Sequence, residues 1–387
     1  MKTILFLGSG ISLPTNLSGL AELTNAVLHE EWQFSSDGLF YPGRNQNLIE
    51  EDPTDSLQRF LKYLTGLADS GHALQGLDRS NYEYLSFIVR PIFDHEHGQS
   101  RNAAISPFIL EVQSQLSRFP VNQDHTNGYE TVLSGMADLA SKLIQSVVRH
   151  KLMTQNAPVG LELVKELARF ADVTIATLNH DLLVETALTE AGISYEDGFG
   201  DPDGEIRWFD EGRLDPTNNP RLLKLHGSIN WFHMAEKSQN PQTPKYVIPQ
   251  KADPWHCKTA SGEALDNWSG GPLFLTGVGN KPTSYNLGIY AEMLFRFHEA
   301  LKSAENIVMS GYGWGDSGIN VRIVDWFFAN NSNQLFLLHE QPESFIEKQT
   351  ALTHRRDRLK NRSQLIEIRK WMENTSLADL VNQGLSI

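Results

Sequence analysis

Short runs of β-branched or aromatic residues, each ending at a glycine or polar turn, recur along the chain and predict strands. These runs are Thr3–Leu7, Val173–Thr177, Leu222–Leu225, Asn306–Met309 and Gln334–Leu338. Several of them lead into segments whose apolar residues recur with a helical period, namely Leu17–His29, Leu182–Ala191, Asn320–Ala329 and Ser344–Leu352. Alternating strands and helices predict an α/β fold in which helices cover both faces of one parallel sheet.

A long stretch between the first two strands, about residues 35–171, carries little strand signal. Its periodic segments predict helices at Ser56–Leu67, Tyr82–Phe93, Ala104–Leu116, Tyr129–His150 and Gly160–Phe170. We therefore expect an α/β domain of residues 1–34 and 172–387, with a helical module of residues 35–171 inserted into it. Residues 201–221 and 237–285 are rich in Pro, Gly, Asn and Asp, which predicts long loops over the edge of the sheet.

Composition narrows the classes of protein to consider. The 387 residues are 40% hydrophobic and 21% charged, as in an ordinary globular protein. The apolar run at the start is cut off by Gly8-Ser9-Gly10, so it predicts a buried strand rather than a secretion signal. No apolar stretch is long enough to cross a bilayer. Cys257 is the single cysteine, which excludes an intramolecular disulfide and favours the reducing cytoplasm. The net charge of −14 argues against direct nucleic-acid binding but allows a basic protein partner.

The first candidate loop, Gly8-Ser9-Gly10-Ile11-Ser12, directly follows the first predicted strand. Its glycines allow a tight turn and a close approach to a pyrophosphate. A helix starting there would add unpaired N–H groups and the positive end of its dipole. Leu13 stands where the full dinucleotide fingerprint has its third glycine, so an ordinary strand-to-helix turn remains the alternative.

The second loop, Thr177-Leu178-Asn179-His180-Asp181, ends the second predicted strand. The carboxamide of Asn179 and the carboxylate of Asp181 can both face a cleft at the carboxyl edge of the sheet. The alternative is that either residue only caps the following helix.

The third loop, Lys224-Leu225-His226-Gly227-Ser228, also follows a strand. The titration range of histidine and the position of His226 before a glycine fit a general base. The alternative is a histidine with a purely structural role.

The fourth loop runs from Ser310 to Asn320 and lies between a predicted strand and a predicted helix. Its alternating glycines expose backbone amides, and Asp316 can cap the helix. A glycine-rich turn with its cap is the alternative. All four loops should meet at the carboxyl edge of one parallel sheet, where α/β folds bind their ligands.

Together these loops resemble the motifs of the sirtuin family, and they follow one another along the chain in the same order as in that family. Gly8–Ser12 is similar to the Gly-Ala-Gly-x-Ser phosphate loop, and Thr177–Asp181 to the Thr-Gln-Asn-x-Asp segment. Leu225-His226-Gly227 matches the catalytic histidine and the glycine after it. Residues 311–320 are similar to the Gly-Tyr-x-x-x-Asp-x-x-x-Asn segment of a divergent bacterial branch.

The resemblance implies a Rossmann-like domain that binds NAD as its substrate and requires no metal. Asn179 and His226 would be the catalytic residues, at the nicotinamide ribose. Asp181 would hold the nicotinamide carboxamide, the first loop would cradle the phosphates, and the fourth would flank the adenosine half. The residues expected to contact NAD are Gly8, Ser9, Gly10, Ser12, Thr177, Asp181, Gly311, Tyr312 and Asp316.

Two departures from the family bear on the activity. Deacylating sirtuins carry a four-cysteine zinc module, which a chain with one cysteine cannot form. The family's Pro-Asp-Phe-Arg segment is also missing, since Leu13-Pro14-Thr15-Asn16 stands in its place. These departures and the helical insertion resemble the sirtuin-like NADases of bacterial antiphage defence. The resemblance thus implies an NAD glycohydrolase that depletes NAD, with an NAD-dependent protein deacylase and a non-catalytic NAD or ADP-ribose sensor as alternatives.

An unregulated NADase would kill its own cell, so its activity must be regulated. The resemblance therefore also implies partners. We expect a homo-oligomer paired with a HerA-like ATPase, with a short Argonaute as the alternative partner and no membrane association. The domain and its insertion nearly fill the chain, so we expect no fused sensor domain. The apolar positions of Tyr129–His150 could pack between subunits. The basic run His354–Arg362 could dock an acidic surface, or it could be a solvated helix face.

Overall fold

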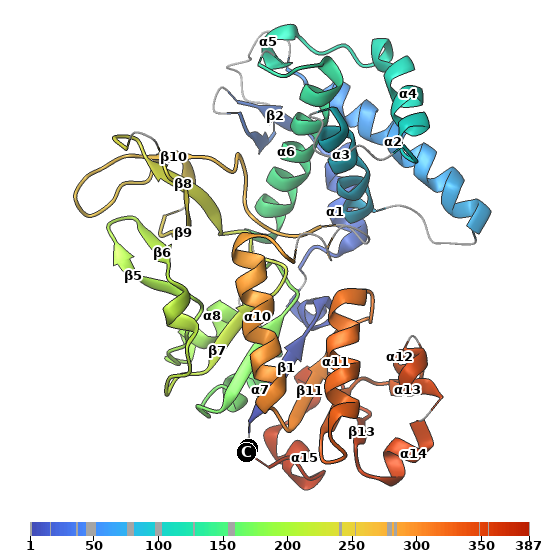
Figure 1. The fold of residues 1–387 in the computed structure, drawn as a ribbon, viewed down its shortest axis with the longest axis vertical. Helices are drawn as coiled ribbons and strands as arrows, with labels where there is room; N and C mark the ends of the chain where they lie inside the picture. Colours follow the sequence, from blue (N-terminus) through green and yellow to red (C-terminus); the bar gives the residue numbers. More distant parts are fainter. Residues whose placement is uncertain are drawn as a thin grey trace.

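The computed structural model describes residues 2–386 except 16, 36–37, 44–51, 76–80, 97–102, 127, 154–158, 240–241, 252, 277–280, 282–284, 348 and 355. It has three parts, which Figure 1 shows with the helical module at the top, a parallel sheet with its helices below, and a second sheet at the side. Among the described helices, none combines the length and the apolar character that a bilayer span requires.

The central element is a six-stranded parallel sheet with the order β13-β12-β11-β1-β4-β7. Its strands are β1 (Thr3–Leu7), β4 (Val173–Thr177), β7 (Arg221–Lys224), β11 (Asn306–Ser310), β12 (Gln334–Leu338) and β13 (Leu365–Ile368). Numbered along the chain within this sheet, the order is 3-2-1-4-5-6, which is the order of Rossmann folds. The predicted parallel α/β sheet is confirmed, with β13 as a strand that the sequence pattern did not predict.

Helices cover both faces of this sheet because its strands alternate their side chains between two hydrophobic cores. Ile4 and Phe6 of β1 pack in one core with α10 (Gly288–Ser303) and α11 (Ser317–Ala329). Leu5 and Leu7 pack in the other core with α7, α8 and α15. The remaining helices around the sheet are α7 (Glu162–Leu167), α8 (Leu183–Glu190), α12 (Pro342–Ile346), α13 (Thr350–Thr353), α14 (Arg356–Asn361) and α15 (Leu377–Asn382).

The helical module has its own core, separate from those of the sheet. Its elements are α1 (Leu20–His29), β2 (Trp32–Phe34), β3 (Phe40–Pro42), α2 (Thr54–Gln75), α3 (Tyr82–Glu96), α4 (Ser106–Ser114), α5 (Gln123–Thr126) and α6 (Val132–Met153). The helices that pack in the module core are not the same as those in the expected range of 35–171. The apolar side chains of α1 belong to the module core, whereas those of α7 belong to the core of the sheet.

Helix α6 lies in the middle of the module rather than at its surface. The apolar side chains along its length are buried against the module's other helices, and only Val132 and Met153 at its ends are exposed. The interpretation of this helix as a surface between subunits is therefore wrong, because the module core already covers its apolar positions.

A second, antiparallel sheet occupies much of the region where long loops were expected. It has the order β10-β8-β9-β6-β5, with β5 (Phe199–Asp203), β6 (Ile206–Phe209), β8 (Phe232–Glu236), β9 (Lys245–Pro249) and β10 (Leu265–Asn267). The loop prediction is wrong for β6, β9, β10 and most of β5, because these strands are short and the turn residues between them dominate the pattern. Cys257 is buried in the small core of this sheet, and burial raises the pKa of its thiol to about 11, as expected for a structural cysteine.

Candidate active site

The four candidate loops lie at the carboxyl ends of β1, β4, β7 and β11, four consecutive neighbours in the parallel sheet. The strand order reverses between β1 and β11, so the crevice beside these two strands is the switch point where such sheets bind ligands. The prediction that these loops share one edge of one sheet is confirmed.

Glycines let the loops after β1 and β11 touch through their backbones. The Gly10 amide donates to the Gly311 carbonyl at 3.0 Å, and the Gly8 amide donates to the Ser310 carbonyl at 3.0 Å. A Cβ on Gly8 would lie 2.6 Å from the Gly311 oxygen. Gly311 has a φ of +69°, and a Cβ there would lie 2.6 Å from the Ile11 nitrogen. These glycines therefore allow the two loops to pack closely at the switch point. Ser9 is exposed in the same turn.

The helix expected at the first loop is not an α-helix. Residues Ser9–Thr15 form a 3₁₀ helix that contains Pro14, and the first α-helix begins only at Leu20, in the helical module. Pro14 has no backbone N–H to donate. The helix at this loop is therefore a short 3₁₀ helix, and the amides at its start are already bonded, with Gly10 donating to Gly311 and Ile11 to the Gly8 carbonyl.

Ser12, Asn179 and Asp181 form a buried polar group across the first and second loops. The Ser12 hydroxyl donates to Asp181 Oδ2 at 3.0 Å. Asn179 Nδ2 lies 3.2 Å from the Gly8 carbonyl and 3.3 Å from Ser12 Oγ, and the Asn179 amide donates to Thr177 Oγ1 at 3.1 Å. Asp181 Oδ1 also accepts from the amide at the start of α8 at 3.1 Å. Asp181 therefore serves both alternatives considered for it, since it holds the helix start and joins the polar group.

One atom of this group has no partner. Asn179 is only 7% exposed, and its Oδ1 atom is buried without a hydrogen bond. The Gly8 carbonyl can only accept, so it orients the amide with Nδ2 toward Gly8 and leaves Oδ1 as the unused acceptor. A buried unpartnered acceptor costs free energy until a ligand or water supplies a donor.

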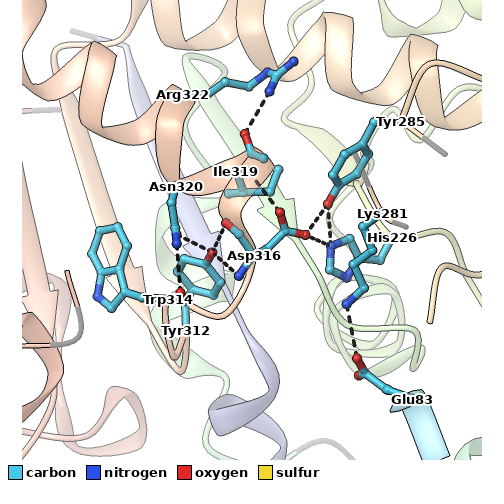
Figure 2. Close-up of polar contacts among 11 residues, drawn as sticks. Glu83, His226, Lys281, Tyr285, Tyr312, Trp314, Asp316, Ile319, Asn320 and Arg322 are labelled. Atoms are coloured by element: carbon cyan, nitrogen blue, oxygen red, sulfur yellow. Dashed lines mark hydrogen bonds and ion pairs between the residues drawn. The ribbon is translucent and has the colours of Figure 1, made fainter. Parts of the chain in front are cut away.

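His226, Tyr285 and Asp316 form a second buried network (Figure 2). His226 Nε2 lies 2.6 Å from the Tyr285 hydroxyl and 2.9 Å from Asp316 Oδ2. The Tyr285 hydroxyl donates to the same Asp316 oxygen at 2.6 Å. Asp316 Oδ1 caps α11 by accepting from the Ile319 amide at 3.0 Å. Asp316 thus caps its helix as anticipated and also connects the third and fourth loops.

Burial lowers the pKa of His226 below its usual 6.5, and the nearby charge of Lys281 lowers it further, while Asp316 opposes both effects. Burial also holds the pKa of His180 well below its usual value. The rings of His180 and His226 have centroids 6.1 Å apart, so the second loop contacts the third here. Both histidines are therefore neutral at neutral pH.

Tyr312 braces the fourth loop from inside. Its ring is buried edge-on against Phe6, with centroids 5.1 Å apart. Its hydroxyl lies 2.6 Å from Asn320 Oδ1 and accepts from the Asp316 amide at 3.2 Å (Figure 2). Trp314 adopts a φ of 58°, a conformation held by the bond from Asn320 Nδ2 to its carbonyl. The position expected to flank adenosine is thus occupied by a tyrosine whose polar atom serves the loop itself.

The predicted residues therefore form two groups, one around Asn179 and one around His226, joined by the glycine contact and by His180. Sequence reasoning missed His180, Tyr285 and the Lys281–Glu83 ion pair of 3.2 Å that reaches α3 of the helical module. His180 is part of the second motif, so the sequence could have indicated it. Tyr285 and Lys281 lie in a region without periodicity, so no local signal marked them.

A cavity of about 620 Å³ lies apart from the predicted residues, between α6, α8 and strands β6 and β9. Lys224 and Glu185 line it and form an ion pair of 2.7 Å, in which the Lys224 side chain is 2% and the Glu185 side chain 16% exposed. Lys224 also donates to the Asp181 carbonyl, which ties this cavity wall to the second loop. Within the described ranges, no three His, Cys, Asp or Glu side chains gather in a group that could hold a metal ion.

The chain has similarities to solved structures and to one domain family. Solved structures with a similar course of the chain include a Sir2 homologue mutant in complex with ADP-ribose and a Sir2 homologue in complex with NAD. Each is 14% identical with a TM-score of 0.32 and covers 60% of this chain, and the chain covers 68% and 65% of them, respectively. No curated protein matches in sequence. Residues 173–365, which hold β4, β7 and β11 with their loops, match the family model of the SIR2-like domain, and this part of the chain is therefore SIR2-like.

Proposed function

We propose that the chain binds NAD at the edge formed by its four loops and hydrolyses the bond between nicotinamide and ribose. The products are nicotinamide and ADP-ribose, and the reaction consumes one water and releases one proton. The observation that carries the proposal is the buried, unpartnered Oδ1 of Asn179, which follows β4 next to the loop after β1 and lies in the part of the chain that matches the SIR2-like domain. A ribose hydroxyl or a water molecule would satisfy that acceptor.

The reaction passes through a ribose with oxocarbenium character, so the site must orient the sugar and deliver water. Asn179 Oδ1 is placed to accept from a ribose hydroxyl or from the attacking water. His226 contributes a neutral imidazole that can take a proton from a ribose hydroxyl. Asp181 already accepts from Ser12 and from the start of α8, and its carboxylate oxygens have further lone pairs for the nicotinamide carboxamide.

Product analysis with and without an acetyl-lysine peptide tests this proposal. The hydrolase releases equal amounts of nicotinamide and ADP-ribose from NAD alone, at a rate that the peptide does not raise. Nicotinamide release that depends on the peptide would support a deacylase instead. NAD binding without turnover, in every assembly tested, would support a sensor.

We further propose that the activity serves bacterial antiphage defence, through a homo-oligomer gated by a HerA-like ATPase. The support for this role is the resemblance of the motifs together with the helical insertion. The basic run is a weaker docking candidate than its sequence suggests, because Glu367 accepts from Arg356 at 2.6 Å and from Lys360 at 2.8 Å. Arg355 of that run lies outside the described residues.

Light scattering and co-purification test this assembly. A homo-oligomer at micromolar concentration that co-purifies with a HerA-like ATPase would support it. A strict monomer whose NADase activity no partner changes would contradict it, and co-purification with a short Argonaute would identify the alternative partner.

A further inference from the structure

The network of His226, Tyr285 and Asp316 determines which nitrogen of His226 carries the proton. Asp316 is 6% exposed, and hydrogen bonds from His226, Tyr285 and the Ile319 amide outweigh its burial and hold its pKa well below the usual range. It is therefore an ionised carboxylate, which can only accept hydrogen bonds. A contact of 2.9 Å between Asp316 Oδ2 and His226 Nε2 consequently requires a proton on Nε2.

Tyr285 does not change this assignment. Its hydroxyl has one proton, which the 2.6 Å bond to Asp316 Oδ2 uses. Its oxygen is then an acceptor for the same Nε2 proton at 2.6 Å. If Tyr285 donated to Nε2 instead, the lone pair of Nε2 would face the Asp316 carboxylate, an arrangement with no proton between two acceptors.

We propose that Asp316, with Tyr285 behind it, holds His226 as the Nε2–H tautomer and so makes Nδ1 the nitrogen that acts as the base. Asp316 and Tyr285 are positioning residues, because they act through His226. The tautomer assignment stands on the network alone, whereas the role of Nδ1 as a base rests on the proposed NAD hydrolysis.

The other groups near His226 are consistent with a neutral ring. Lys281 faces it and disfavours the charged form, and Glu83, paired with Lys281, opposes this. His180 packs beside it and is itself neutral. Asp316 is the carboxylate in direct contact with the ring, so it governs the tautomer.

Substituting Asp316→Asn isolates this effect. Asn is as good an N-cap as Asp, so Oδ1 can keep its bond to the Ile319 amide and α11 should remain formed. The amide Nδ2 then replaces Oδ2 opposite His226. Because Nδ2 donates, it requires a lone pair on Nε2, and the proton of the neutral ring moves to Nδ1. Asp325→Asn is the matched control, since Asp325 is exposed on the same helix.

Nitrogen-15 NMR of histidine-labelled protein reads the tautomer directly, with His226 assigned by its loss in His226→Gln. We expect Nε2–H in the wild type and in Asp325→Asn, and Nδ1–H in Asp316→Asn. A wild-type protein with Nδ1–H, or an Asp316→Asn variant with an unchanged tautomer, would overturn the proposal. This measurement needs no NAD, so its outcome is independent of the proposed function.

Kinetics test the consequence for catalysis. We expect Asp316→Asn to lower kcat for NAD cleavage about 10²- to 10⁴-fold with little change in KM. Tyr285→Phe keeps the carboxylate beside Nε2, and we expect it to lower kcat by less than about 10-fold. Because Asp316 raises the pKa of His226, the acid limb of the residual pH profile should move to lower pH in Asp316→Asn. An unshifted acid limb with wild-type kcat would contradict the positioning role.

Discussion

The two polar groups at the edge of the sheet differ in how completely they are bonded. Around His226, the ring nitrogen Nε2, the Tyr285 hydroxyl and the Asp316 carboxylate all have partners within the protein. Around Asn179, the donors have hydrogen-bond acceptors, but the carboxamide oxygen of Asn179 is buried without a hydrogen-bond partner. Both groups are buried and belong to neighbouring loops, so exposure does not explain the contrast.

The contrast indicates that the Asn179 group and the His226 group have different roles. A closed network fixes the orientation and proton of its histidine before any ligand arrives, which lowers the cost of reorganisation during the reaction. A group with an unused acceptor is completed only by a ligand. The Asn179 group is therefore expected to govern contact with the sugar or water, and the His226 group to govern the chemistry.

Alanine substitutions at the two centres should have the largest effect. We expect Asn179→Ala and His226→Ala each to slow NAD cleavage about 10²- to 10⁴-fold, because each removes an oriented polar group or a base. Steady-state rates and circular dichroism of both variants would check this. His298→Ala, at an exposed position on α10, is the control for the histidine change. Wild-type turnover in either folded site variant would remove that residue from the mechanism.

Substitution of Lys224, which bonds to the backbone of the Asn179 group, should have the next largest effect. Lys224 is 2% exposed, pairs with Glu185 and donates to the Asp181 carbonyl. Lys224→Met leaves the largely buried Glu185 without its cation, and we expect it to lower the free energy of unfolding by about 3–5 kcal/mol. Denaturant titration would measure the change. The double variant Lys224→Met with Glu185→Leu should recover part of it, and a double variant no more stable than Lys224→Met would show that the pair is not the cause.

Acid should destabilise the His226 side. The pKa values of His180 and His226 lie below 6.5 in the folded protein, so the unfolded state binds more protons as the pH falls. Their contribution to stability is complete above the unfolded value and is lost as the pH falls toward the folded values. We expect the free energy of unfolding to drop from about pH 7 to about pH 5, by up to about 1.4 kcal/mol per pH unit for each histidine. Denaturant titrations across this range would show it, and His180→Gln should flatten the slope. An identical slope in that variant would exclude His180.

The smallest effect should come from the hydroxyl that links Asn179 to Asp181. We expect Ser12→Ala to lower the free energy of unfolding by about 1–3 kcal/mol, as for two ordinary hydrogen bonds. Thermal unfolding would report it, with Ser9→Ala in the same turn as an exposed control. A loss as large as that of Lys224→Met would mean that the Asn179 group collapses without Ser12.

Much of this architecture was predictable because local pattern carries it. Strands β1, β4, β7, β11 and β12 are apolar runs that end in glycine or polar turns, and their loops carry motifs in a recognisable order. The antiparallel sheet was not predictable in this way, since its strands are short and divided by turn residues. β13 was missed because it has four residues, one of them the charged Glu367.

The site was predictable by residue type but not by partnership. Asn179, His226 and Asp316 are visible in motifs, whereas the bonds of His226 to Tyr285 and Asp316 span 59 and 90 residues of sequence. Such contacts depend on how α10, α11 and the loops pack together. The glycines were read as a cradle for phosphate, but the contact of Gly8 and Gly10 with Gly311 depends on two strands that are adjacent only in the folded sheet.

Hydrogen–deuterium exchange with and without NAD tests the central claim most directly, namely that the four loops are the NAD site. ADP-ribose serves as a second ligand that hydrolysis would not consume. The account predicts that both ligands slow exchange in the loops at residues 8–12, 177–181, 225–228 and 311–316. Slowed exchange confined to the walls of the separate cavity, in α8 and β9, with the four loops unchanged, would contradict it.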